Sequence, residues 1–290
     1  MRSMLTGTLI VLGLVIAAFA GMCLLLYLQQ DRFLFVPQRT DAALAKDWLQ
    51  YRVEIGAGNH KVEGWWAENP AADNRAVVLY FGGNAEDVLS TAVTAERIGA
   101  RKLLVTNYRG YGKTPGTPSQ AGLFEDALAV YDYAVSRPGV LPSDIVVMGR
   151  SLGSGVATWV AASRPVKAAI LITPYDSILS VASHHYSAFP VRALLRHPFP
   201  SKELAAKATA PALMIAAERD DVIPPVHTER LAKAWAGPVE THLLSGMAHN
   251  NIEQSAGYYS LINAFLHRVA PAPVLSAPAS STNIPGASAP

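Results

Sequence analysis

Short apolar runs alternate with amphipathic segments along the middle of the chain, over residues 46–270. The middle runs, such as AVVLYF and KLLVTN, are apolar throughout, which is typical of parallel strands covered on both faces. The first two alternate in polarity, as an antiparallel pair at a sheet edge does. The eight strand candidates are Tyr51–Ile55, Val62–Ala67, Ala76–Phe81, Lys102–Asn107, Asp144–Met148, Lys167–Thr173, Ala212–Ala217 and Glu240–Leu244.

Amphipathic segments of helical length separate the later strands. The helix candidates are Glu86–Gly99, Gln120–Ser136, Leu152–Ser163, Pro225–Ala236 and Tyr258–Val269. This alternation predicts an α/β fold: a mostly parallel central sheet with helices on both faces, in a single domain over residues 46–270. Ligands of such folds bind beyond the carboxyl ends of the strands, so we expect the chemistry in the loops that follow them.

The amino-terminal segment has a different pattern. Met4–Leu28 contains no charged residue and is long enough to span a hydrocarbon core of about 30 Å. We predict a membrane anchor over residues 1–30 and a linker over 31–45. The alternative is a cleaved signal peptide, because the A-x-A sequence at 18–20 resembles a cleavage site. The apolar run continues past that site, which favours the anchor.

The charged residues that flank this segment bear on which side of the membrane the domain lies. Counting Lys and Arg favours a cytoplasmic domain, whereas the short segment before the helix is typical of a signal anchor, and large domains translocate regardless of such charges. We therefore expect an extracytoplasmic domain.

Residues 271–290 carry no charge and are rich in Pro, Ala and Ser, which predicts a disordered tail.

Composition then narrows the classes of protein. Hydrophobic residues make up 50% of the chain and charged residues 16%, which excludes an intrinsically disordered protein. The net charge of +2 gives no basic surface for nucleic acid. A single cysteine excludes an intrachain disulfide and a cysteine-based zinc site, and the histidines lack metal-ligand spacing. We expect no metal, no cofactor and no nucleic-acid partner.

The most specific motif is GRSLGSG, at 149–155, directly after a predicted strand and opening a predicted helix. It fits the G-x-S-x-G nucleophile elbow, in which a strained turn exposes the oxygen of Ser151. The turn also aims the N–H of Leu152 at a developing oxyanion. A glycine-rich turn that only packs a helix on a sheet is the alternative; a dinucleotide-binding fingerprint does not fit the spacing.

A nucleophilic serine needs a base, and the base needs an acid to orient it. In this architecture the order along the chain is serine, acid, histidine, each after a later strand. ALMIAA is followed by Asp220 and Asp221, and ETHLL is followed by His249. The order holds, and we expect a triad of Ser151, His249 and one of the two aspartates.

The strand AVVLYF is followed by Gly82-Gly83-Asn84. Glycines let a backbone approach a substrate closely, so we expect the N–H of Asn84 to be the second oxyanion donor. An ordinary turn with Asn84 as a helix N-cap is the alternative, and both roles are compatible.

Several stretches carry a family resemblance over residues 30–268. They are LYFGGNAED (79–87), NYRGYGKTPGTPS (107–119), GRSLGSG (149–155), ERDDVIPP (218–225) and GMAHNN (246–251). They resemble the α/β-hydrolase superfamily, and more narrowly the small membrane-anchored serine hydrolases that include lysophospholipid lipases and protein depalmitoylases. The resemblance implies the α/β-hydrolase fold, and its D-x-V-I-P pattern assigns the acid to Asp220. The family typically has His-Gly-Asn where this chain has Gly82-Gly83-Asn84.

The resemblance also implies that residues 176–207 form a short lid over the serine. Leucine and phenylalanine side chains in this insertion would make an apolar wall for an acyl chain. Arg192 and Arg196 would share a face if the segment is helical. They would then either meet an anionic head group or form a solvated basic face, the reading we favour.

The sequence therefore predicts a membrane-anchored serine hydrolase that cleaves carboxylic ester or thioester bonds of small acyl or lipid substrates through Ser151, His249 and Asp220. The oxyanion hole would be the N–H groups of Asn84 and Leu152. The alternatives are a serine peptidase of the same fold and a non-catalytic, membrane-tethered scaffold.

Overall fold

Eight strands form one sheet in the computed structural model, which describes residues 2–272. The order across the sheet is β1-β2-β4-β3-β5-β6-β7-β8. The strand bounds are β1 Arg52–Ala57, β2 His60–Glu68, β3 Val77–Phe81, β4 Lys102–Thr106, β5 Ile145–Arg150, β6 Ala168–Ile172, β7 Ala212–Ala217 and β8 Val239–Leu244. All eight lie where the apolar runs predicted strands.

Strand directions follow the polarity patterns. The strand β2 is antiparallel to both β1 and β4, while every other neighbouring pair is parallel. Side chains of the central strands β3, β6 and β7 are buried throughout, because helices cover the sheet on both sides. The predicted α/β class, with a mostly parallel sheet, is confirmed.

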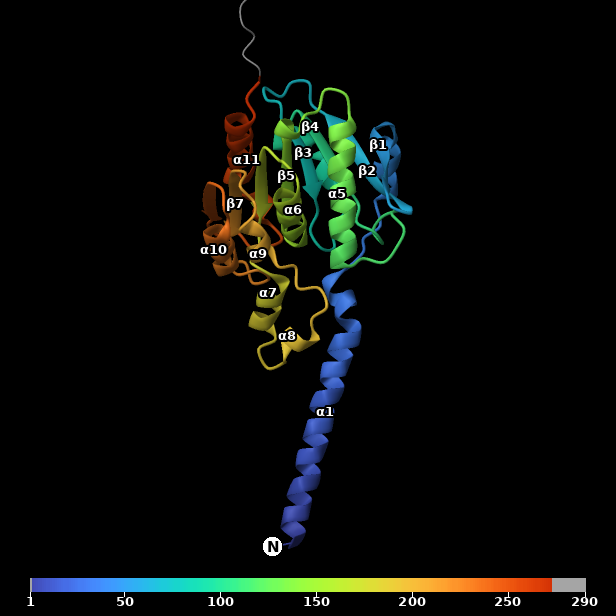
Figure 1. Ribbon diagram of the computed structural model, residues 1–290, viewed down its shortest axis with the longest axis vertical. Coiled ribbons are helices and arrows are strands. Elements are labelled where there is room, and N and C mark those ends of the chain that lie inside the picture. The colour runs from blue at the N-terminus through green and yellow to red at the C-terminus, as the bar shows by residue number, and fades with distance from the viewer. Residues whose placement is uncertain (1, 273–290) are drawn as a thin grey trace, which may run out of the picture.

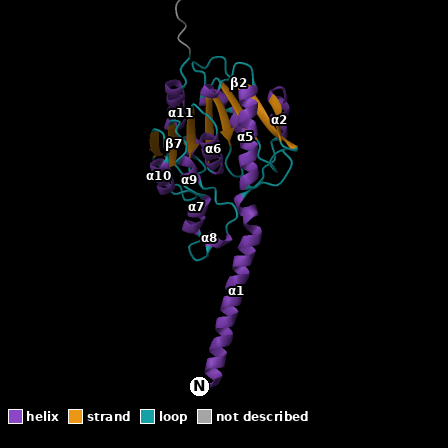
Figure 2. Cartoon of the chain, in the orientation of Figure 1, coloured by secondary structure: helices purple, strands orange, loops and turns teal. Residues whose placement is uncertain are grey.

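Helices lie on both faces of the sheet (Figure 2). One core packs α5, α6, α9 and α10 against the sheet, and a second core packs α3, α4 and α11 against the opposite face. The helix bounds are α1 Arg2–Leu34, α2 Ala42–Asp47, α3 Val88–Val93, α4 Ala95–Ile98, α5 Gln120–Ser136, α6 Leu152–Ser163, α7 Ile178–His185, α8 Val191–Leu194, α9 Ser201–Ala205, α10 Pro225–Ala234 and α11 Ala256–Val269. Short 3-10 turns are Leu49–Tyr51, Pro142–Asp144 and Ile252–Gln254.

The predicted single helix Glu86–Gly99 is wrong, because the segment is divided into α3 and α4. The break is at Thr94: its N–H bonds to the carbonyl of Thr91, three residues back, at 3.0 Å, and its φ and ψ are −91° and 13°. The helix cannot continue in register through that geometry. Gly99 then ends α4 in the left-handed conformation, with φ of 73°.

The helix α1 extends away from the sheet, at the end where α7 and α8 also lie (Figure 1). Its segment Met4–Leu34 is long and apolar enough to cross a membrane, by length and composition. A signal sequence near an amino terminus meets the same criterion. The helix runs without interruption to Leu34, beyond the anchor predicted for residues 1–30.

The insertion 176–207 contains α7, α8 and α9. The helix α8 ends at Leu194, and Leu195 is extended, with ψ of 123°. Arg192 and Arg196 therefore do not share a helical face. Arg196 instead forms an ion pair with Asp31 of α1, at 2.8 Å.

The predicted disordered tail, residues 271–290, falls outside the described residues except at its first two positions. Pro271 forms an isolated antiparallel bridge with Asn74. Pro271 thus lies beside the segment that leads into β3.

Candidate active site

Ser151 occupies the turn between β5 and α6. Its φ is 50° and its ψ is −118°, a conformation that L-residues rarely adopt. The flanking glycines make the turn possible. A Cβ on Gly149 would lie 2.1 Å from the carbonyl oxygen of Gly153, and a Cβ on Gly153 would lie 2.0 Å from that of Phe81. The motif thus folds as the strained strand-to-helix turn that its glycines predicted.

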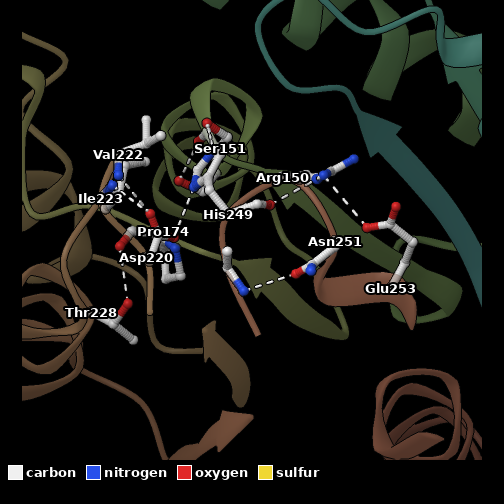
Figure 3. A network of polar contacts seen from close by, with 12 residues as sticks. Arg150, Ser151, Pro174, Asp220, Val222, Ile223, Thr228, His249, Asn251 and Glu253 are labelled. Carbon is white, nitrogen blue, oxygen red and sulfur yellow. Dashed lines mark hydrogen bonds and ion pairs between the residues drawn. The ribbon is translucent and has the colours of Figure 1, made fainter. Parts of the chain in front are cut away.

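Ser151, His249 and Asp220 form a hydrogen-bonded chain (Figure 3). The Nε2 atom of His249 is 2.9 Å from the Ser151 Oγ, and its Nδ1 atom is 2.8 Å from Oδ2 of Asp220. His249 and Asp220 are 7% and 5% exposed, so little water competes for these bonds. The Asp220 carboxylate accepts a hydrogen bond from the N–H at Nδ1. The neutral imidazole therefore carries its proton on Nδ1, and Nε2 is free to accept the serine proton.

Asp220, rather than Asp221, faces the histidine. The other carboxylate oxygen of Asp220, Oδ1, accepts hydrogen bonds from the N–H groups of Val222 at 3.0 Å and Ile223 at 2.7 Å. Asp221 is exposed. The turn DDVIP therefore fixes one carboxylate towards His249 and directs the other to the surface.

The loop Gly82-Gly83-Asn84 lies beside the serine. A Cβ on Gly83 would lie 3.6 Å from the Cβ of Ser151, and Asn84 lines the same cavity as Ser151 and Leu152. The alternative role of Asn84 as a helix N-cap is wrong, because Asp87 caps α3 through the N–H of Leu89. The N–H of Leu152 is in the first turn of α6, where it has no acceptor within the helix.

A polar network behind this loop was not anticipated from the sequence. The Oε2 atom of Glu86 accepts the N–H of Gly83 at 2.7 Å, and its Oε1 accepts the hydroxyl of Tyr80 at 2.7 Å. Arg150 donates to the carbonyl of His249 at 3.3 Å and pairs with Glu253 at 3.5 Å. Arg150 also pairs with Glu86 at 4.0 Å, so the network links the glycine loop to the histidine loop. Both residues lie in the quoted stretches, but no role for either was predicted from the sequence.

Arg150 stays charged within this network. Burial lowers the pKa of its guanidinium, but the neighbouring Tyr80, Glu86 and Glu253 outweigh burial and leave the pKa above its ordinary value. Burial, with the Glu86 charge, raises the pKa of Tyr80 well above 10.0. Tyr80 thus remains a hydroxyl donor to Glu86 at physiological pH.

A cavity of about 580 Å³ opens in front of the serine. Its polar floor contains Ser151 and Asn84. Most of its walls are apolar and come from the lid and from α1: Leu26, Phe33, Leu34, Ile178, Val181, Ala182, Phe189, Val191, Leu194 and Leu195. The sequence predicts this helix only as an anchor. Its cavity residues, at positions 26, 30, 33 and 34, lie on one helical face, but the rest of α1 is equally apolar and no sequence signal singles this face out.

Other titratable pairs lie outside the cavity's floor. Asp176 and His227 form a buried pair with 2.7 Å between Oδ1 and Nδ1. Burial would raise the pKa of Asp176, but the His227 bond and charge leave it below its ordinary value of 3.8. His242 bonds to Glu240 on β8, at 2.7 Å. In residues 2–272 no three His, Cys, Asp or Glu side chains gather in a way that would hold a metal ion.

A strained serine turn, a buried histidine and aspartate and a glycine loop at the carboxyl ends of parallel strands define a serine hydrolase class of site. A family model described as "Serine hydrolase" matches residues 136–268. The chain is 33% identical over 268 residues to an uncharacterized protein of Mycobacterium tuberculosis, covering 90% of this chain and 95% of that one. It is 30% identical over 206 residues to the human alpha/beta hydrolase domain-containing protein 17C, covering 69% and 62%.

Solved structures have the same fold. Est1E from Butyrivibrio proteoclasticus matches with a TM-score of 0.62 at 16% identity, covering 75% of this chain and 98% of that one. The Pyrococcus furiosus esterase Pf2001 matches with a TM-score of 0.64 at 18% identity, covering 81% and 99%. The chain belongs to the α/β-hydrolase superfamily. It is a hydrolase, as the resemblance implied, and the predicted α/β-hydrolase fold is confirmed.

Proposed function

We propose that the protein is a membrane-anchored serine hydrolase that cleaves esters or thioesters of apolar acyl groups through Ser151, His249 and Asp220. The observation that carries the proposal is the continuous hydrogen-bonded chain from the serine oxygen through the imidazole to a buried carboxylate. It opens on a cavity whose walls are mostly apolar.

In the proposed reaction, the Ser151 Oγ attacks the acyl carbonyl while Nε2 of His249 takes the serine proton. Asp220 holds the imidazole in the required tautomer and stabilises its positive charge. The N–H groups of Asn84 and Leu152 donate to the oxyanion, and the amino-terminal end of α6 adds positive potential there. The acyl–oxygen or acyl–sulfur bond then breaks, and His249 returns the proton to the leaving group. Water, activated by the same imidazole, releases the acid from Ser151.

The cavity walls favour an acyl group over a peptide. A peptide main chain would present N–H and C=O groups that need polar partners, and unsatisfied polar groups are costly to bury. The walls of this cavity are instead mostly leucine, isoleucine, valine and phenylalanine side chains, with Gln30, His185 and Tyr186 as the polar exceptions. Its volume lies within the range of about 300–1,000 Å³ typical of small-molecule sites.

A fluorophosphonate probe tests the proposed chemistry on the full chain in detergent. We expect the wild type to label at a single serine, and Ser151→Ala to abolish labelling. His249→Ala should reduce labelling severely because the serine loses its base. Ser154→Ala is the matched control: Ser154 lies in the first turn of α6, where its hydroxyl donates to the carbonyl of Ser151. A wild type that does not label supports the scaffold alternative, and turnover of peptides but not esters supports the peptidase.

We further propose that α1 remains attached and crosses the membrane, with the catalytic domain on the extracytoplasmic side. What supports an anchor over a cleaved signal is the unbroken helix through residues 18–20 to Leu34, whose last turns line the cavity. Membrane flotation with intact amino-terminal sequence tests the anchor. Protease protection in intact cells tests the side: we expect added protease to digest the domain, and protection would place the domain in the cytoplasm.

A further inference from the structure

The carboxyl-terminal half of α1 forms one wall of the cavity that contains Ser151. Leu26, Gln30, Phe33 and Leu34 all line it. They repeat at helical spacing, so they form a single stripe along α1. The wall opposite belongs to α7 and α8, which include Ile178, Val181 and Leu194. The cavity is therefore a cleft between the apolar helix and the lid, with the serine at its inner end.

Polar contacts from Gln30 and Asp31 of α1 hold this helix and the lid together. The side-chain amide of Gln30 donates to the carbonyl of Leu194 at 2.9 Å, and its oxygen accepts the N–H of Arg196 at 2.7 Å. Asp31 pairs with Arg196 at 2.8 Å and with His197 at 3.2 Å. These contacts fix the lid against α1 and thereby fix the width of the cleft.

The tip of the lid lies much further along α1. The rings of Phe189 and Phe19 are stacked, with centroids 5.6 Å apart. Phe19 is twelve residues before Asp31, the first charged residue after Arg2, which corresponds to about 18 Å along the helix axis. Half of a hydrocarbon core is about 15 Å. If α1 spans a membrane with Asp31 at the interface, Phe189 lies at the depth of the acyl chains.

We infer that α1 is the specificity wall of an acyl-binding cleft and that a long acyl chain enters this cleft sideways from the bilayer, between α1 and the lid. The inference rests on the proposed function, since it assumes that Ser151 is the nucleophile. The occupant is the acyl chain of a membrane-resident ester or thioester. Its carbonyl lies at Ser151 and its chain lies along Leu26 and Phe33, towards Phe189.

A bulky side chain on the α1 wall of the cleft tests whether the acyl chain lies there. Leu26→Trp places a bulky ring in the cleft, eight residues or about 12 Å of helix before the end of α1 that leads to Val36 and Asn84. Leu28→Trp makes the same change about 200° around the helix, where Leu28 is exposed and does not line the cavity. Full chains in phosphatidylcholine vesicles are assayed with nitrophenyl butyrate and nitrophenyl palmitate. Leu26→Trp should lower kcat/KM for palmitate by at least about tenfold and leave butyrate within about twofold. Leu28→Trp should leave both substrates within about twofold.

Equal palmitate hydrolysis by the two tryptophan variants overturns the inference, as does an equal loss on both esters by Leu26→Trp. Failure of the wild type to hydrolyse butyrate, with no fluorophosphonate label on Ser151, instead overturns the proposed function. Palmitoyl lysophosphatidylcholine and an S-palmitoylated peptide then distinguish the lipid from the lipidated peptide as the source of the chain. Leu26→Trp should lower kcat/KM for whichever of these two substrates the wild type hydrolyses.

A second measurement does not depend on turnover. A hexadecyl fluorophosphonate with a diazirine at the end of its chain is attached to Ser151 and then photolysed. We expect crosslinks to α1 near Leu26 and to the lid near Phe189. Crosslinks confined to other parts of the domain would show that the chain lies elsewhere and would overturn the inference.

Discussion

The N–H of Val36 donates a hydrogen bond of 2.7 Å to the side-chain oxygen of Asn84. Val36 lies two residues after the end of α1, and Asn84 is the residue whose N–H we propose as an oxyanion donor. Tyr111 completes the arrangement: its hydroxyl donates to the same Asn84 oxygen at 3.0 Å and accepts from the N–H of Val36 at 3.0 Å. The chain that leaves the apolar helix thus holds the loop beside the serine.

This relationship predicts the effect of Asn84→Ala. The main-chain donor is retained, but the loop loses its tie to Val36 and Tyr111, so the donor is less well aligned in the transition state. We expect kcat for nitrophenyl butyrate to fall by about tenfold with KM nearly unchanged. Tyr111→Phe should give a smaller fall in kcat, while Tyr133→Phe, whose ring packs against Trp66, should give none. An unchanged kcat in Asn84→Ala would show that the hydrogen bonds from Val36 and Tyr111 to the Asn84 side chain do not contribute to catalysis.

The two adjacent aspartates should differ sharply. Asp220→Asn replaces the carboxylate that accepts from His249, so the imidazole loses its orienting charge and its preferred tautomer. We expect kcat to fall by about 10⁴-fold. Asp221→Asn changes an exposed side chain, and its kcat should stay within about twofold of the wild type. Steady-state kinetics of both variants check the assignment, and the reverse ranking would move the acid to Asp221.

The close packing of the serine turn predicts the effect of Gly153→Ala. The added Cβ would lie 2.0 Å from the carbonyl oxygen of Phe81, a backbone atom that cannot move without displacing β3. We expect a loss of about 3 kcal/mol in the free energy of unfolding, together with lost activity. Gly56→Ala is the control, because a Cβ there meets nothing within 4 Å. Urea unfolding of both variants gives the comparison, and equal stabilities would contradict the packing argument.

The buried Asp176 predicts a loss of stability in acid. Its pKa is below the ordinary 3.8 in the folded chain, so folding favours the ionised form. The corresponding stability is fully present above about pH 5 and is lost as the pH falls through 3.8 towards the folded pKa. His227→Gln removes the bond and the charge that lower this pKa, so we expect a less stable protein whose stability falls less steeply below pH 4. Urea unfolding at a series of pH values checks the slope, and parallel curves for variant and wild type would exclude the pair as its source.

The sequence by itself determined the order of strands and helices, because a strand buried on both faces must be apolar throughout. It also determined which serine could occupy a strained turn, since only glycines fit at positions 149 and 153. The later strands, the motif and its candidate partners were therefore readable from local composition. Where local geometry decided the outcome, as at Thr94, composition predicted one helix and the backbone formed two.

Only the tertiary structure decided which distant side chains meet. The family pattern already pointed to Asp220, but the turn that buries Asp220 and exposes Asp221 became visible only in the fold. The network of Glu86, Arg150 and Glu253 joins the loop after β3, the end of β5 and the 3-10 turn before α11. The sequence predicted α1 as a membrane segment and nothing more. Hydrophobicity alone does not distinguish a leucine that faces lipid from Leu26, which lines the cavity. Such contacts depend on how the chain folds back on itself, and no local pattern encodes them.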